Sequence, residues 1–300
     1  MLQIFNEKNR DLLVNINGRL LHRDEAGVSP FDSSVQGGDA VWEGLRVYQG
    51  RIFKLREHLD RLRNSALALA FNDIPSHEVI TEEIRRTLAA NAMHDNVHIR
   101  LTLTRGVKIT SGMDPRLNQS GPTLIVLAEH KAPVYDTRGL SLVTSSVRRF
   151  SPDCLDPKIH HNNLLQSILA KIEANATGAD DAVMLDTRGF VAETNATHLF
   201  LVDDSVLRTP RTVACPEGIT RATVLEICAA NGIAHEVMDL SLAEFYRADE
   251  VFCTGTMGEL AAVVRIDGRS IGSGKAGPMT LRLSELFRDR TRVEGTRVCD

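Results

Sequence analysis

The amino-acid sequence predicts an α+β protein with two domains. Its 300 residues are more than one small domain needs and enough for two hydrophobic cores. Strand-like segments bounded by turn residues are mixed with amphipathic helices, without the regular strand–helix alternation of a parallel sheet. Periodicity is lost from His130 to Arg138. We therefore predict an N-terminal domain at 1–131, a linker at 132–138 and a C-terminal domain at 139–300.

Composition and charge predict a globular protein without a nucleic-acid or membrane partner. The chain is 43% hydrophobic and 25% charged, and its net charge of −4 provides no basic surface. The start lacks a signal-peptide core and no later apolar run spans a bilayer, so we expect a cytoplasmic location. The five cysteines are widely spaced without a CxxC pair, and no histidine spacing fits a metal. We expect neither a disulfide framework nor a metal site.

The N-terminal half is predicted to contain antiparallel strands and two helices. Turn pairs at Asn17–Gly18 and Gln49–Gly50 separate apolar runs and indicate two hairpins. Apolar residues at helical spacing predict a helix from about Arg56, and a second helix follows Pro75. TLIVLAE, at 123–129, predicts a further strand.

The strand predicted from Asn96 to Thr104 has two unlike faces. Apolar side chains alternate strictly with the polar side chains of His98, Arg100, Thr102 and Thr104. Two interpretations of the polar face are open: it faces solvent, as in many antiparallel sheets, or it lines a site for an anionic ligand.

The C-terminal half is predicted to be a run of hairpins with three helices. Strands are expected in SLVTSSV, DAVMLD, FVAETNATHLFLV, VLRTP, EVMDL and VFCTG, and LAAVVRIDGRSIG is typical of a hairpin. One helix is predicted from about Ile219 to Ala230, and another in GPMTLRLSELFRDR.

The remaining helix follows a lysine that is a candidate for the chemistry. Apolar residues at helical spacing predict a helix from Asn163 that buries one face and stops at Gly178. The apolar residues are Leu164, Leu165, Ile168, Leu169 and Ile172. Lys158 is thus held between Pro157 and a buried helix, where partial loss of solvation would make it a nucleophile toward a carbonyl. The alternative is an ordinary surface lysine.

Two turns and an arginine are suited to a phosphate. Ile219 and Thr220 begin a helix after Gly218, where unpaired N–H groups favour an anion. Gly255 and Thr256 form a second small-residue turn directly after a strand. Arg56, off the apolar stripe of its helix, would supply a positive charge. The alternatives are an ordinary capped helix and a solvated arginine.

A carboxylate completes a set that matches pyridoxal 5′-phosphate. Glu193 lies among apolar strand residues, where it needs a cationic partner such as a protonated pyridine nitrogen. The aldehyde of this cofactor forms a Schiff base with a lysine, its phosphate needs donors, and its ring nitrogen needs a carboxylate.

These residues lie in motifs that resemble the class IV aminotransferases of pyridoxal-phosphate fold type IV. The motifs are WEGLRVY, FKLREHLDRL, KIHHNNLLQSILAKIEA, DAVMLDTRGFVAETNATHLF, GITR, ADEVFCTGT and a late GP. The resemblance runs from about Gly38 to Phe287. It implies an α+β N-terminal domain, a larger pseudo-barrel C-terminal domain as in D-amino acid aminotransferase, and a homodimer.

The resemblance also implies residue roles. Lys158 would form the Schiff base and move the proton, and Glu193 would hold the pyridine nitrogen. The phosphate would be held by Arg56, Ile219, Thr220 and Thr256, with Gly255 in the same turn.

Substrate residues are less uniform across the family. Trp42 of the WEGLRVY motif is expected at the substrate, and Arg100 and Arg105 are both candidates for its carboxylate. Asn163 stands where branched-chain enzymes usually carry a tyrosine.

The leading prediction is transamination between an α-amino acid, either branched-chain L- or D-, and a 2-oxo acid such as 2-oxoglutarate. The alternatives are an (R)-selective amine transaminase, an aminodeoxychorismate lyase-like enzyme, and a cofactor-binding homologue without activity.

Overall fold

The computed structural model describes residues 4–131 and 138–299, which form two compact units. The first unit contains 4–131 together with two short later segments, 159–163 and 291–299. The second contains 138–158 and 164–290. The predicted two-domain α+β architecture is confirmed, although the two short segments had been predicted in the C-terminal domain. Apart from its last residue, the predicted linker at 132–138 lies outside the described residues.

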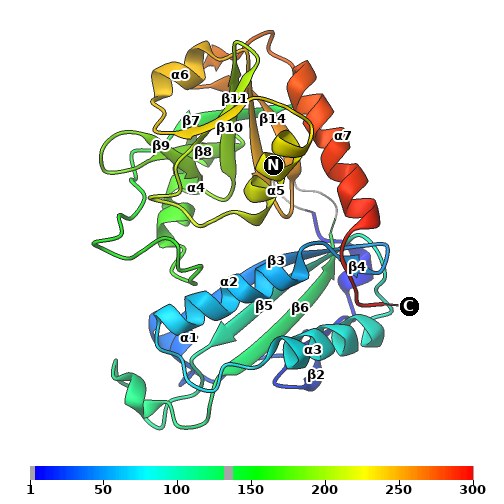
Figure 1. Ribbon diagram of the computed structural model, residues 1–300. Coiled ribbons are helices and arrows are strands. Elements are labelled where there is room, and N and C mark those ends of the chain that lie inside the picture. The colour runs from blue at the N-terminus through cyan, green and yellow to red at the C-terminus, as the bar shows by residue number, and fades with distance from the viewer. Residues whose placement is uncertain (1–3, 132–137, 300) are drawn as a thin grey trace. The chain divides into compact units, whose positions relative to one another are not determined.

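The first unit is built on a seven-stranded antiparallel sheet in the order β16-β4-β3-β5-β6-β1-β2 (Figure 1). Its strands are β1 (Leu13–Ile16), β2 (Arg19–His22), β3 (Ala40–Tyr48), β4 (Arg51–Ile52), β5 (Val97–Thr104), β6 (Thr123–His130) and β16 (Thr296–Arg297). Its helices are α1 (Ser33–Gly37), α2 (Leu55–Ala68) and α3 (His77–Ala90), with 3₁₀ turns at Glu7–Asn9 and Pro115–Leu117. Both predicted hairpins are present, and each turn uses a pair of residues with positive φ, as two-residue turns of this kind require.

Helices α2 and α3 cover one face of this sheet (Figure 1). Side chains from both helices join those of β3, β5 and β6 in one hydrophobic core. The apolar face of β5 lies in that core as predicted. On the other face His98, Thr102 and Thr104 are also buried. The interpretation that this face is open to solvent was therefore wrong.

The second unit contains a nine-stranded mixed sheet in the order β12-β11-β10-β13-β14-β7-β8-β9, with β15 paired to β14. Its strands are β7 (Leu140–Thr144), β8 (Asp181–Leu185), β9 (Val191–Thr194), β10 (His198–Asp203), β11 (Val206–Pro210), β12 (His235–Met238), β13 (Glu250–Gly255), β14 (Glu259–Ile266) and β15 (Arg269–Ser270). β9 also contacts β11, far from it in the sheet order, so the sheet curls toward a barrel as expected.

The helices of this unit are α4 (Leu165–Thr177), α5 (Ile219–Ala230) and α6 (Leu242–Arg247). A further helix, α7 (Pro278–Val293), follows them in the chain. α6 was not predicted, although Ser241 and Glu244 form a capping box at its start. The strands β7 and β8, which α4 connects, pair in parallel, whereas only hairpins had been predicted in this half of the chain. The predicted single strand FVAETNATHLFLV breaks after Thr194 into β9 and β10.

Helix α4 buries the opposite face from the one predicted. Its buried residues are the small side chains of Ala170 and Ala174. The large side chains of Leu165, Ile168, Leu169 and Ile172 are 50–66% exposed. The predicted stop at Gly178, which has a φ of 73°, is confirmed.

Within the described residues, no helix is long and apolar enough to cross a membrane. The same residues contain no cluster of three or more metal-ligating side chains.

Truncation of the α3 core contact should destabilise the first unit. Ile84 is fully buried, so Ile84→Ala should cost about 2–5 kcal/mol, because a cavity replaces the lost side chain. Val79→Ala on the same helix is the control; Val79 is 52% exposed, and we expect a change within about 0.5 kcal/mol. Urea unfolding followed by fluorescence of Trp42, the single tryptophan, measures both. Equal losses of unfolding free energy in Ile84→Ala and Val79→Ala would contradict this packing.

Candidate active site

Lys158 lies in the connection between β7 and α4. Its N–H donates to Asp156 Oδ1 at 3.0 Å, in a turn that contains the buried Pro157. The side chain of Lys158 is exposed, so the protein alone does not produce the predicted loss of solvation. Lys158 is the last residue of the second unit before the chain enters the first unit at Ile159.

Glu193 lies on β9 and is 4% exposed. Its carboxylate pairs with the guanidinium of Arg149, which also donates to Ser167 Oγ on α4 at 3.2 Å. A buried carboxylate needs such a partner. The burial predicted for Glu193 is confirmed, but its partner within the chain, Arg149, was missed. The only signal was a pair of adjacent arginines shortly before the lysine segment.

The charges of Lys158 and Glu193 both act on one buried thiol. Cys215, on the segment before α5, is almost fully buried. Burial raises the pKa of the Cys215 thiol, and the negative charge of Glu193 raises it further. The positive charges of Arg149, Arg221 and Lys158 oppose this shift in the pKa. All four charged groups therefore lie close enough to act on one sulfur atom.

The start of α5 is a rigid helix N-terminus. Gly218 caps it without a side-chain hydrogen bond, and a Cβ at this position would lie 2.2 Å from Cδ2 of His198. Arg221 donates to the carbonyl of Pro210 at 2.9 Å and ties the first turn of the helix to β11. Ile219 and Thr220 are thus the first residues of a fixed helix end, where backbone N–H groups favour an anion.

The second predicted turn follows β13, which ends at Gly255. A Cβ at Gly255 would lie 3.0 Å from Cγ2 of Thr197, so the turn packs closely on its neighbour. Thr254 is 1% exposed, and its hydroxyl has no hydrogen-bond partner among the described residues. Its cross-strand neighbour is His198, the residue against which Gly218 packs. An unpaired buried hydroxyl beside a helix start and the Gly255–Thr256 turn fits a phosphate.

The first unit carries the predicted substrate residues. Arg100 stacks on Trp42, with its guanidinium carbon 3.5 Å from the ring centroid, and donates to Asn162 Oδ1 at 2.8 Å. Burial lowers the pKa of Arg100 to about 10, opposed by the charge of Glu43. The Arg100 guanidinium has no direct carboxylate contact in the hydrogen bonds and ion pairs of the described residues. It can therefore bind one from a ligand.

Arg105 has a different environment. Its guanidinium forms two bonds with Asp39, at 2.6 and 3.1 Å, and also donates to the carbonyls of Leu69 and Ala70. These contacts make it a structural residue, so Arg100 is the stronger carboxylate candidate.

Two predicted residues of the first unit are exposed. The side chain of Arg56, at the second position of α2, is 86% exposed and lies 3.9 Å from Asp60. Asn163 is exposed at the end of the short segment 159–163.

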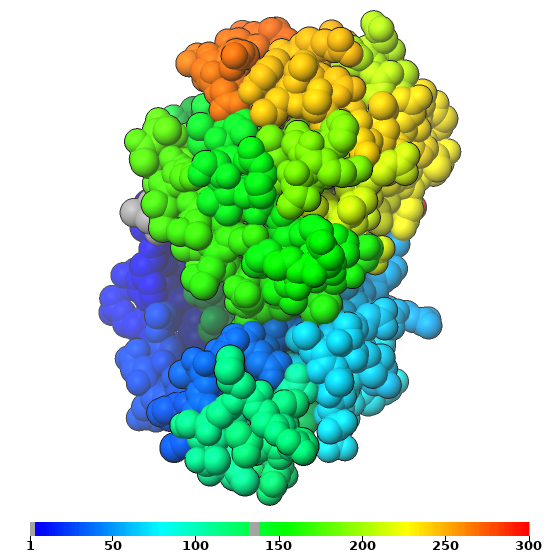
Figure 2. All heavy atoms as spheres, turned by 90° about the vertical axis from the view of Figure 1, so that its left-hand side faces the viewer, coloured from blue at the N-terminus to red at the C-terminus, as the bar shows by residue number. Residues whose placement is uncertain are grey.

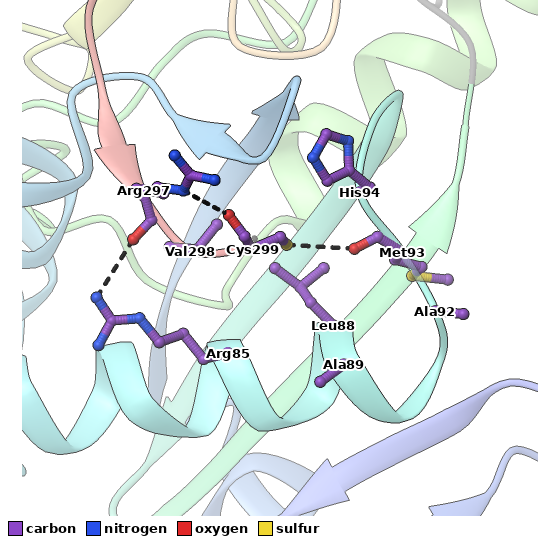
Figure 3. Close-up of a pocket in the computed structure, with 9 residues that line it drawn as sticks. All are labelled: Arg85, Leu88, Ala89, Ala92, Met93, His94, Arg297, Val298 and Cys299. Carbon is purple, nitrogen blue, oxygen red and sulfur yellow. Dashed lines mark hydrogen bonds between the residues drawn. The ribbon is translucent and has the colours of Figure 1, made fainter.

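A separate cavity of about 580 Å³ lies in the first unit between the end of α3 and the C-terminal segment (Figure 3). Arg85, His94, Arg297 and Cys299 are among its lining residues. None of the predicted site residues lines it.

The combination of Lys158, the Glu193–Arg149 pair and the α5 terminus agrees with a comparison against known families. A family model described as amino-transferase class IV matches residues 40–266. The chain belongs to the class IV aminotransferases.

Known class IV aminotransferases and related proteins match most of this chain. It is 57% identical, over 96% of its length, to "Branched-chain-amino-acid aminotransferase-like protein 2" of Arabidopsis thaliana, of which it spans 52%. It therefore covers about half the length of that relative. It is 31% identical to the D-alanine aminotransferase of Bacillus licheniformis, over 89% of this chain and 93% of the relative. The structure of the branched-chain amino acid aminotransferase of Thermobaculum terrenum in its PLP form matches with a TM-score of 0.84 and 26% identity, covering 95% of each chain.

Removal of Arg149 should destabilise this class IV aminotransferase by leaving the Glu193 carboxylate buried and unpaired. We expect Arg149→Met to cost about 3–5 kcal/mol of unfolding free energy, and Arg149→Met/Glu193→Gln to cost clearly less. Arg211→Met, which removes an arginine that is 58% exposed and lies 3.9 Å from Asp239 in the same unit, is the control and should change little. Urea unfolding measures all three. Equal losses in the single and double variants would contradict the coupling.

Proposed function

We propose that this chain is a pyridoxal 5′-phosphate-dependent aminotransferase, which moves an amino group between an α-amino acid and a 2-oxo acid. The observation that carries the proposal is the grouping of Lys158 with the Glu193–Arg149 pair around Cys215, in a class IV aminotransferase. The neighbouring α5 terminus and Gly255–Thr256 turn supply the phosphate-binding groups.

The residues present fit this cofactor. When bound, the cofactor supplies a carbonyl that an amine can attack and a ring that accepts electrons from the substrate. The Glu193 carboxylate would accept a hydrogen bond from the ring nitrogen, while Arg149 stabilises its negative charge. The N–H groups of Ile219 and Thr220 and the turn at Gly255–Thr256 would hold the phosphate, with Arg56 as a further cationic ligand. The unpaired hydroxyl of Thr254 beside this turn supports the assignment.

Lys158 has two tasks in this proposal. Its exposed amine is free to bond covalently to a carbonyl carbon. Once displaced by a substrate amine, the same nitrogen can take a proton from the substrate Cα and return one at the other side of the reacting system. A lysine on a short, turn-restrained connection can make both transfers without moving its backbone.

The substrate class follows from Arg100. Its guanidinium lies on Trp42 and is oriented by Asn162, so its remaining donors are held in one plane for a carboxylate. This favours an amino acid over a plain amine. L-branched-chain and D-amino acids are both consistent with the names of its relatives, and the assay below distinguishes them.

A homodimer is part of the proposal. The stripe of Leu165, Ile168, Leu169 and Ile172 on α4 is 50–66% exposed. The green part of the chain, to which α4 belongs, lies on the face shown in Figure 2. The charges beside it are already satisfied within the chain, since Lys171 pairs with Asp181 and Glu173 accepts bonds from Ser145 and Ser146. An uncharged apolar stripe favours an equally apolar partner, and a second copy of α4 provides one in a two-fold symmetric contact.

The predicted cytoplasmic location is supported by the cysteines. All five are free thiols, as expected where thiols are kept reduced.

A half-reaction screen tests the proposed function. The enzyme loaded with pyridoxal phosphate should change its visible absorbance with one hand of an amino acid and regenerate it with 2-oxoglutarate. Lys158→Ala should lose at least about 1,000-fold in turnover, because it lacks the nucleophile and the proton-transfer group. Lys275→Ala, at an exposed lysine of the same unit, is the control and should keep its activity. Spectrophotometry of each half-reaction with paired L- and D-amino acids and (R)-amines gives the result.

Other outcomes of that screen would overturn the assignment. Pyruvate released without an amino acceptor would indicate the lyase, and a response to (R)-amines alone would indicate the amine transaminase. Cofactor binding without any spectral change would indicate a protein that only binds the cofactor. Full turnover in Lys158→Ala would exclude this lysine.

A charge placed in the α4 stripe should break the dimer. Ile168→Glu places a carboxylate where an apolar contact is proposed, so sedimentation velocity should show the monomer mass where the wild type shows twice that mass. Leu281→Glu makes the same kind of change at an exposed leucine on α7 and should remain dimeric. A dimeric Ile168→Glu variant would place the interface elsewhere.

A further inference from the structure

The segment directly after Lys158 is fixed to β3. Residues 159–163 belong to the first unit, although the chain on both sides of them belongs to the second. The N–H of Trp42 donates to the carbonyl of His160 at 3.0 Å, and the N–H of Asn162 donates to the carbonyl of Ala40 at 2.9 Å. The N–H of His160 donates to Ser65 Oγ at 3.0 Å. With the bond from Trp42 Nε1 to the carbonyl of His161 and the bond from Arg100 to Asn162, five contacts hold a segment only five residues long.

The side chain of His160 adds to this attachment. Its Nδ1 lies 2.6 Å from the carbonyl oxygen of Trp42 and 3.3 Å from Oε1 of Glu43. Both neighbours are acceptors, so Nδ1 carries the hydrogen. The imidazole also stacks on the Trp42 indole, with 4.3 Å between ring centroids. His160 is therefore held in one orientation by a carbonyl, a carboxylate and an aromatic ring.

Glu43 is the buried centre of this network. It is fully buried on β3, and it accepts two bonds of 2.7 Å from Arg61 and one of 2.7 Å from His58. Burial alone would raise the pKa of Glu43, but the charge of Arg61 and the hydrogen bonds from Arg61 and His160 outweigh it and hold the pKa well below its ordinary value. Burial and the charge of Arg61 lower the pKa of His160, opposed by Glu43. The network therefore contains a carboxylate and a neutral imidazole near pH 7.

We infer that His160 and Glu43 are positioning residues for Lys158, because they fix the segment to which the backbone of this lysine is directly joined. The inference rests on the proposed role of Lys158. Lys158 has a turn contact of its own on one side, at Asp156, and the anchored segment on the other. A displacement of about 1 Å at a reacting group can cost about 100-fold in rate, so this anchoring acts on turnover and not only on stability.

A pair of substitutions at His160 tests the anchoring itself. His160→Leu removes the Nδ1–H donor, whereas the side-chain amide of His160→Asn retains a donor near the same place. In the full-length chain, amide hydrogen exchange of the peptides containing Trp42, His160 and Asn162 should accelerate at least tenfold in His160→Leu and stay near the wild-type rate in His160→Asn. His94→Leu, an exposed histidine of the same unit, is the control (Figure 3). Unchanged exchange in His160→Leu would overturn the anchoring, whether or not the enzyme is an aminotransferase.

Kinetics of the same variants test the consequence for Lys158. With the substrate pair found by the screen, His160→Leu should lower kcat about 10- to 100-fold with KM within threefold, and His160→Asn should restore most of the loss. Thermal unfolding confirms that each variant is folded at the assay temperature. If His160→Leu does not fold, Glu43→Gln/Arg61→Met removes the same centre without leaving a charge unpaired. A folded variant with faster exchange and normal kcat would show a purely structural role and overturn the inference. If the wild type has no turnover at all, the proposed function fails, and the exchange result still decides the anchoring.

Discussion

The chain crosses from one folded unit to the other at Lys158, the residue proposed to carry the chemistry, and this constraint shapes the rest of the structure. Lys158 ends a stretch of the second unit, and the next five residues pair with β3 of the first. A lysine side chain has large conformational freedom of its own, so the precision of its amine depends on its backbone. Attachment on both sides of one peptide bond restricts that backbone, whereas a solvent-exposed loop of the same length would leave it mobile.

Two buried carboxylates, Glu43 and Glu193, are stabilised in the same way, by an arginine. Glu43 and Glu193 are each almost completely removed from water, and each pairs with a guanidinium, Arg61 and Arg149 respectively. Hydrophobic residues in their place would cost less to bury, so such pairs are poor devices for stability. They are better devices for orientation, because a charged bond between rigid groups has few alternative geometries. Glu43 orients the segment after the lysine, and in the proposed function Glu193 faces the cofactor ring.

Local patterns predicted what depends on local physics. The hairpins at Asn17–Gly18 and Gln49–Gly50 follow from residues that tolerate positive φ, and the start of α5 follows from a glycine and its helical period. Arg149 and the Glu43 network could not be predicted in this way, because each joins residues from separate elements through charge complementarity. A single sequence shows that an arginine is present, but the carboxylate it meets is decided by the folded sheet. The parallel β7–α4–β8 crossover was also missed, because the pairing of strands that are distant in the sequence is decided by the folded sheet.

Helix α4 shows that a correctly recognised helical period can still predict the wrong buried face. The repeat of Leu165, Ile168, Leu169 and Ile172 predicted a helix at the right place with the right C-terminal stop. Periodicity reports that a face avoids water, but it is silent on which surface covers that face. In the folded chain the close contact with β7 and β8 is made by Ala170 and Ala174, whose small side chains let the helix approach the sheet. The larger residues stay exposed within the chain, so the periodic pattern located the helix but did not identify the face that packs on the sheet.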